Sequence, residues 1–191
     1  MPKLSSRSRL TYDGRVATHL VLTVIGDDRP GLVELLSESI AGHGGNWLES
    51  RMSHLAGKFA GLLRASVPDE SAEALVAALR ALEGRGLHVR VESGAEDVTA
   101  PGNRALTLEL VGHDRAGIVR DISRVLAVHK INVEEFASEC ASAPMTGETL
   151  FQATAQLRAP ATLSIDALRE ALEELANELM VDVSLRDTPG D

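Results

Sequence analysis

The sequence has a single cysteine, few aromatic residues and no apolar run long enough to cross a bilayer. One cysteine, Cys140, excludes an internal disulfide framework and favours a reducing cytoplasm; we interpret it as a small strand residue rather than a nucleophile. Aromatics make up 3% of the 191 residues, so stacking surfaces for single-stranded nucleic acid are scarce. Residues 1–9 lack the apolar core of a secretory signal. These features predict a cytoplasmic protein that does not associate with membranes.

Basic residues are also few, with 19 Lys and Arg against 28 Asp and Glu. The net charge is −9 and the pI is about 5.2. Nucleic-acid binding draws much of its affinity from neutralised phosphates, so an acidic surface opposes direct contact with DNA. The basic residues Lys3, Arg7, Arg9 and Arg15 cluster near the start, and we expect residues 1–17 to be a disordered leader.

The usual signatures of catalysis are missing. The sequence has no Cys-x-x-Cys, His-Glu-x-x-His, Gly-x-Ser-x-Gly or phosphate-loop pattern. The six histidines are dispersed, and His43 and His129 fall where helices are expected to end, a position that favours a cation. We therefore expect a protein that is not an enzyme and needs no cofactor or metal.

What the sequence does contain is a duplication. Residues 22–31 read LTVIGDDRPG and residues 108–117 read LELVGHDRAG, an ungapped match at an offset of 86. The match continues through the apolar positions of the following segment to Asn46 and Asn132. The offset grows to 90 where Gly57 aligns with Gly147 and to 93 where Ser71 aligns with Ser164, which places insertions in loops. Two related domains are therefore predicted.

Hydrophobic periodicity gives each copy the order βαββαβ. In the first copy we expect strands near residues 20–25, 46–55, 59–67 and 87–91, a helix from about Pro30 that buries Leu32, Val33, Leu36 and Ile40, and a second helix capped by Ser71. In the second copy the strands are expected at 104–111, 131–140, 148–157 and 181–185, with helices at 116–129 and after Ser164.

This order is that of an α+β, ferredoxin-like unit, a four-stranded antiparallel sheet with two helices on one face. We place the domains at residues 18–93 and 104–187, with a polar linker at 94–103 and a tail at 188–191. The helix-free sheet face has to be covered by edge-to-edge pairing, face-to-face stacking or another chain, so packing between domains or a homo-oligomer is expected.

The turn between the first strand and the first helix carries the functional prediction. A helix N-terminus favours an anion, a glycine admits a ligand close to the backbone, and a nearby aspartate accepts hydrogen bonds from an ammonium group. Together with an asparagine at the start of the second strand, these groups fit a zwitterionic amino acid. The alternative is structural: the aspartates cap the helix, the arginines form surface ion pairs and the asparagines are turn residues.

The pattern of strand, Asp-Arg-Pro-Gly, apolar helix and Gly-Gly-Asn resembles the ACT domain, a regulatory module of amino-acid and nucleotide metabolic enzymes, from Thr18 to Arg186. In that family an amino acid tends to bind at an interface between two modules. The resemblance implies the following ligand-binding residues: Asp28, Arg29, Gly31, Leu32 and Asn46 in the first copy, and Asp114, Arg115, Gly117, Ile118 and Asn132 in the second. The first turn, with Pro30, keeps more of the pattern and is our preferred site.

A chain of two ACT units resembles the glycine cleavage system transcriptional repressor group. This implies a cytoplasmic regulator that binds glycine or a related amino acid and represses transcription through a protein partner, a transcription regulator, without direct contact to nucleic acid. A ligand-free interaction module, or a regulatory subunit of an amino-acid metabolic enzyme, remains the alternative.

Overall fold

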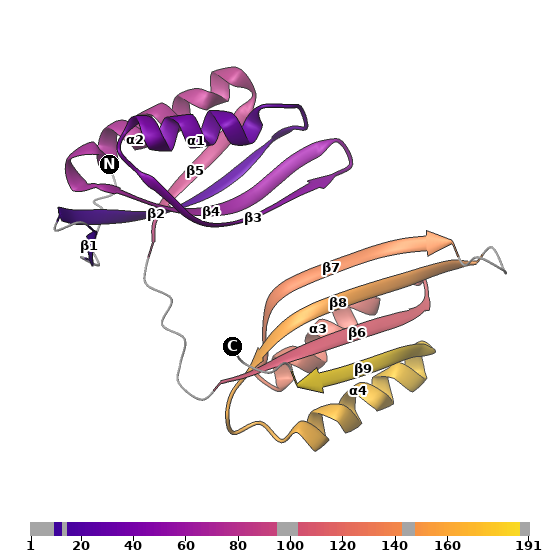
Figure 1. The fold of residues 1–191 in the computed structure, drawn as a ribbon. Helices are drawn as coiled ribbons and strands as arrows, with labels where there is room; N and C mark the ends of the chain where they lie inside the picture. The colour runs from indigo at the N-terminus through magenta and orange to yellow at the C-terminus, as the bar shows by residue number, and fades with distance from the viewer. Residues whose placement is uncertain (1–9, 13–14, 95–102, 143–147, 188–191) are drawn as a thin grey trace. The chain divides into compact units, whose positions relative to one another are not determined.

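The computed structural model describes residues 10–12, 15–94, 103–142 and 148–187 (Figure 1). It divides into two compact units, residues 1–97 and 98–191. The ends of the chain, residues 1–9 and 188–191, and most of the expected linker, residues 95–102, lie outside the described residues, as do 13–14 and 143–147.

The first unit is a sheet covered by helices on one face. Its elements, in chain order, are β1 (Leu10–Tyr12), β2 (Arg15–Asp27), α1 (Leu32–Gly42), β3 (Asn46–Leu55), β4 (Lys58–Pro68), the 3-10 turn η1 (Asp69–Ser71), α2 (Ala72–Ala81), the 3-10 turn η2 (Leu82–Arg85) and β5 (Leu87–Ser93). The strand order is β1-β2-β4-β3, and β5 pairs with β2; every pairing is antiparallel.

The second unit repeats the arrangement of the first from β2 onward, with a four-stranded sheet. It contains β6 (Arg104–His113), α3 (Ile118–Val128), β7 (Asn132–Ser142), β8 (Thr149–Ala159), α4 (Ile165–Leu179) and β9 (Val181–Asp187). The sheet has the order β7-β8-β6-β9, again antiparallel throughout. The α+β fold of two ferredoxin-like βαββαβ units predicted from the sequence is confirmed.

Each unit has its own hydrophobic core between sheet and helices. Alternate residues of the central strand point to the helices because strand side chains alternate between faces. In the first unit these are Leu20, Leu22 and Val24, and in the second they are Leu106, Leu108 and Leu110, all at most 3% exposed. The sheet therefore has one buried face and one face without helices.

The prediction for the first helix was wrong in two details. The helix begins at Leu32 rather than Pro30, because Gly31 has a positive φ of 90° and cannot belong to it. Val33 is 48% exposed, and Leu35 is buried in its place. The buried positions 32, 35, 36 and 40 follow the spacing of one helix face, from which Val33 points away.

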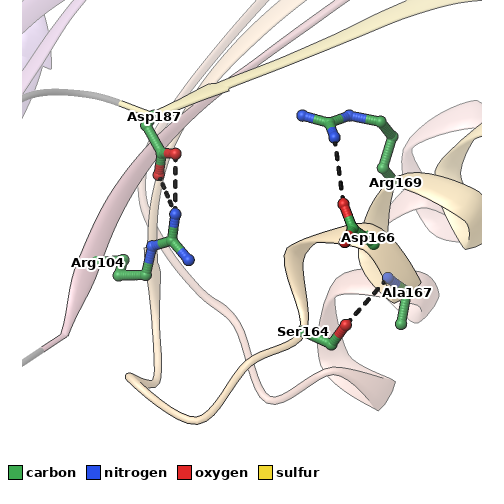
Figure 2. A network of polar contacts seen from close by, with 6 residues as sticks. All are labelled: Arg104, Ser164, Asp166, Ala167, Arg169 and Asp187. Atoms are coloured by element: carbon green, nitrogen blue, oxygen red, sulfur yellow. Dashed lines mark hydrogen bonds and ion pairs between the residues drawn. The ribbon is translucent and has the colours of Figure 1, made fainter.

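The two second helices begin differently. Ser71 precedes α2, but its side chain makes no capping hydrogen bond, and η1 leads the chain into the helix instead. Ser164 does cap α4, since its hydroxyl accepts a hydrogen bond from the backbone N–H of Ala167 at 3.3 Å (Figure 2). In the same figure Asp166 pairs with Arg169, and Arg104 at the start of β6 donates to both carboxylate oxygens of Asp187 in β9.

The register corrects the length of the second hairpin. Asp27 pairs with Lys58 in the first unit and the equivalent His113 pairs with Leu150, so the structural offset at this hairpin is 92 rather than 90. The predicted change of offset from 86 to 90 implied an insertion of four residues, whereas the change from 86 to 92 makes it six residues long. Sequence alignment on the glycines at 57 and 147 misplaced it.

The expectation of a disordered leader over residues 1–17 was wrong for its second half. Leu10–Tyr12 form β1 and pair with residues 15–17 of β2. The basic composition of the segment concealed this strand.

Candidate functional site

The two turns have the same backbone geometry. Gly31 precedes α1 with φ 90° and ψ 0°, and Gly117 precedes α3 with φ 98° and ψ −4°. The carbonyl of each glycine accepts the first intrahelical hydrogen bond, from Leu35 and from Asp121, both at 3.0 Å. Within the described residues no side chain caps either helix, so the N–H groups of the first turn remain directed at an incoming acceptor.

The turn aspartates do not cap the helices. Their backbone N–H groups donate across to the neighbouring hairpin, Asp28 to the carbonyl of Gly57 and Asp114 to that of Thr149, each at 3.0 Å. The carboxylate of Asp28 lies 3.7 Å from Nε2 of His54 in β3. In the second unit, partial desolvation and the nearby carboxylate of Asp114 raise the pKa of the Cys140 thiol in β7.

These two partners were missed in the sequence. His54 and Cys140 are equivalent, because they are separated by the same offset of 86 as the turns. A search of the duplicated segments for positions where both copies carry a polar or reactive side chain would have found them. They place an imidazole beside the first turn and a thiol beside the second.

The turn arginines reach the end of the second helix. Arg29 Nη2 donates to the carbonyl of Arg85 at 2.6 Å, at the end of η2, and Arg115 Nη1 donates to the carbonyl of Glu178 at 3.4 Å, near the end of α4. A cation is favoured at a helix C-terminus, where carbonyls lack intrahelical partners. Both contacts fasten the turn to its own unit, a role that the sequence did not suggest.

The remaining predicted residues occupy two places. Leu32 and Ile118 are each 2% exposed and lie in the cores, so their contribution to a ligand would be the backbone N–H. Asn46 and Asn132 begin β3 and β7 and are exposed. Across the sheet, Asn46 of β3 pairs with Ser66 of β4, and Ser66 pairs with His19 of β2. The turn, in contrast, follows Asp27 at the other end of β2.

The asparagine and the turn of one unit are therefore far apart. His19 and Asp27 are eight residues apart along β2, which corresponds to about 27 Å at about 3.4 Å per residue. A small amino acid cannot touch both ends of that span. The predicted set therefore does not come together within one unit.

The charges around the turns differ. Asp27 forms an ion pair with Lys58, which lowers the pKa of the Asp27 carboxyl, whereas His113 Nδ1 lies 3.9 Å from the carboxylate of Glu148. At the third and seventh residues of α1 the sequence has Glu34 and Glu38, where α3 of the second unit has Arg120 and Arg124. Arg120 forms an ion pair with Asp121 at 2.8 Å and lowers the pKa of that carboxyl.

Other features of the chain fit a supporting role. His43 and His129 occupy the C-cap positions of α1 and α3, as predicted, and His43 Nδ1 lies 2.7 Å from the carbonyl of Ser39. In the described parts of the chain no cluster of three or more His, Cys, Asp or Glu side chains is arranged to hold a metal ion. No helix there is long and apolar enough to cross a membrane.

The fold and the repeated turn define a protein of two ferredoxin-like units, each with an uncapped helix behind a left-handed glycine. Residues 18–92 match the family model of the ACT domain, so the first unit is an ACT domain. The second unit repeats its topology and its turn, so both units have the same ferredoxin-like fold.

Solved structures extend the likeness over both units. The chain is similar to an unknown protein from Galdieria sulphuraria, with 28% identity and a TM-score of 0.82, covering 91% of this chain and 99% of that one. It also resembles a structure described as a "putative glycine cleavage system transcriptional repressor", with 19% identity, a TM-score of 0.66 and the same coverage. No curated protein matches the sequence.

Proposed function

We propose that the chain is a non-enzymatic regulator that responds to an amino acid and acts through contact with another protein. One observation carries this proposal: the same turn is built twice, with a left-handed glycine, an uncapped helix N-terminus and an aspartate held beside it. The helix offers N–H donors to a carboxylate, and the aspartate offers an acceptor to an ammonium group.

The likeness to a described glycine cleavage repressor supports glycine as the first ligand to test and repression as the output. Glycine has five heavy atoms, and at about 1.5 kcal/mol per atom its binding free energy is bounded near 7.5 kcal/mol, or low micromolar affinity. Titrations should therefore extend from micromolar to millimolar concentrations, the range of an abundant metabolite.

The span between turn and asparagine makes the proposed site bipartite. The turn of one unit supplies the N–H groups and the aspartate, and the asparagine comes from a second copy of the chain. This is the reason that we include a homo-oligomer among the proposed partners, beside an amino acid and a transcription regulator.

Calorimetry with a panel of amino acids tests the proposal. We expect a saturable signal for glycine or a close relative that Asp28→Ala and Asn46→Ala both weaken. Asp166→Ala and Asn177→Ala, exposed on α4, are the matched controls and should bind as the unaltered protein does. An absence of response to every amino acid would favour the ligand-free interaction module instead.

The indirect route to DNA needs a separate measurement. With a net charge of −9, the protein alone should give no specific shift of operator DNA at physiological salt. A shift should appear only with the protein partner present. A specific shift by the purified protein alone would contradict the proposed route, whatever the ligand.

A further inference from the structure

The face of each sheet that carries no helices is called here its open face, and the register fixes its residues. On the first unit they are Val21, Thr23 and Ile25 of β2, Ala60, Leu62 and Arg64 of β4, Glu49, Arg51 and Ser53 of β3, and His88, Arg90 and Glu92 of β5. The equivalent residues of the second unit are Thr107, Glu109 and Val111 of β6, Gln152, Thr154 and Gln156 of β8, Glu135, Ala137 and Glu139 of β7, and Asp182, Ser184 and Arg186 of β9.

The two open faces have opposite charge. Three arginines outnumber two glutamates on the open face of the first unit. The open face of the second unit has four carboxylates and one arginine, Arg186. The guanidinium of Arg186 lies 3.0 Å from the carboxylate of Glu109. The difference arises in a duplicated fold at equivalent positions, so the topology of the sheet does not require it.

The two open faces also differ in surface shape. Across the middle of the first sheet Arg90, Thr23, Leu62 and Arg51 lie side by side, and Leu62 is 53% exposed. At the equivalent positions the second sheet has Ser184, Glu109, Thr154 and Ala137. The small side chains leave a hollow of about 340 Å³ whose lining includes Glu109, Ala137, Glu139 and Thr154.

We propose that the open face of the first unit docks on the open face of the second unit in a second copy of this chain. Leu62 enters the hollow, and the flanking Arg51 and Arg90 approach the carboxylates of Glu109 and Glu139. Under a two-fold axis the same contact forms twice, which closes the assembly as a dimer. The proposal concerns the assembly of the chain and does not depend on any ligand at the turns.

Charge decides which faces meet. Two copies of the acidic face would place like charges opposite one another, which opposes association, whereas the basic face brings opposite charge to the carboxylates. The ion pairs present within the faces are exposed: Arg90 with Glu92 at 2.8 Å, Arg51 with Glu49 at 3.0 Å and Arg186 with Glu109 at 3.0 Å. Exposed pairs contribute little, so exchanging them for contacts across the interface is inexpensive.

Sedimentation velocity and light scattering on the full chain test this proposal. We expect a mass twice the chain mass of 20.3 kDa. The double substitution Glu109→Arg with Glu139→Arg should weaken the dimer by about 10-fold or more, as should Arg51→Glu with Arg90→Glu, because each places like charges across the contact. All four changes in one chain reverse both faces and should restore the dimer.

The matched control places the same change of charge on the helix side. Glu173→Arg with Glu174→Arg alters exposed residues of α4 and should leave the mass unchanged. Unaltered unfolding temperatures would show that the reversed variants remain folded. A monomer at all concentrations, including one whose own two open faces contact each other, would overturn the proposal. A dimer whose mass is unchanged by the charge reversals would do the same, as would a variant with all four changes that stays monomeric.

Discussion

Gly31 serves two purposes that substitution can separate. Its φ of 90° lies in the left-handed region, which costs a residue with a Cβ about 1–2 kcal/mol. A Cβ added there would meet nothing nearer than Oε2 of Glu34 at 3.7 Å, so the backbone alone sets the cost. We therefore expect Gly31→Ala to destabilise the first unit by about 1–2 kcal/mol, and Gly31→Asn by less, because asparagine tolerates this region better.

Trp47 makes the measurement specific. It is the only tryptophan of the chain and packs against the core of the first unit, so its fluorescence during urea unfolding reports on that unit alone. For a domain of this size about 1 kcal/mol corresponds to about 4–8 °C in unfolding temperature. Equal losses for alanine and asparagine, or no loss for either, would refute the strain argument.

Binding answers the second question. If Gly31 also admits the ligand to the backbone, both substitutions should weaken amino-acid binding, since each adds a Cβ beside the free N–H groups. Gly57→Ala is the control: Gly57 has φ 75° with nothing within 4 Å of its would-be Cβ, so it should lose stability and keep binding. Normal binding by Gly31→Asn would limit this glycine to a conformational role.

Three further changes test the local physics. Lys130 has a φ of 58° where the first unit has Gly44, so Lys130→Gly should raise the thermal stability of the second unit by about 1 kcal/mol in calorimetry. Lys58 lowers the pKa of Asp27, and this adds to the stability of the folded unit above about pH 4 and is lost as the pH falls through the lowered pKa. Lys58→Met should therefore reduce the difference in unfolding free energy between about pH 7 and pH 3, which Trp47 fluorescence would follow. Asp114 contributes to the raised pKa of Cys140, so Asp114→Asn should speed alkylation of the thiol near pH 8.

The sequence was sufficient for the fold because the duplication and the two hydrophobic periods agree. Apolar alternation in β2 and β6 and helical spacing in α1 and α3 both reflect burial, which the cores confirm. Two of the errors fall where burial gives no information. The start of α1 depends on the φ of one glycine, and the hairpin offset of 92 depends on the hydrogen-bond register of the strands that the loop joins.

The candidate site was predicted as a set of residues, but not as a geometry. The turns carry a signal in Gly31 and Gly117 because a positive φ restricts the residue type. The tether of Arg29 to the carbonyl of Arg85 leaves no such signal, since any residue supplies a carbonyl. The separation of Asn46 from its own turn follows from the antiparallel path of the strands, which pattern matching along the chain does not measure.

Duplication has preserved the backbone of the two turns while their charges have diverged. The first turn of α1 carries Glu34 with Glu38 one turn further, and the equivalent positions of α3 carry Arg120 and Arg124. An anion near a helix N-terminus gains from the dipole in both units, but the glutamates oppose it in the first and the arginines assist it in the second. The sequence pattern favoured the first turn because it retains Pro30. Electrostatics favours the second for a carboxylate, so we expect the two sites to differ in the ligand charge that they accept.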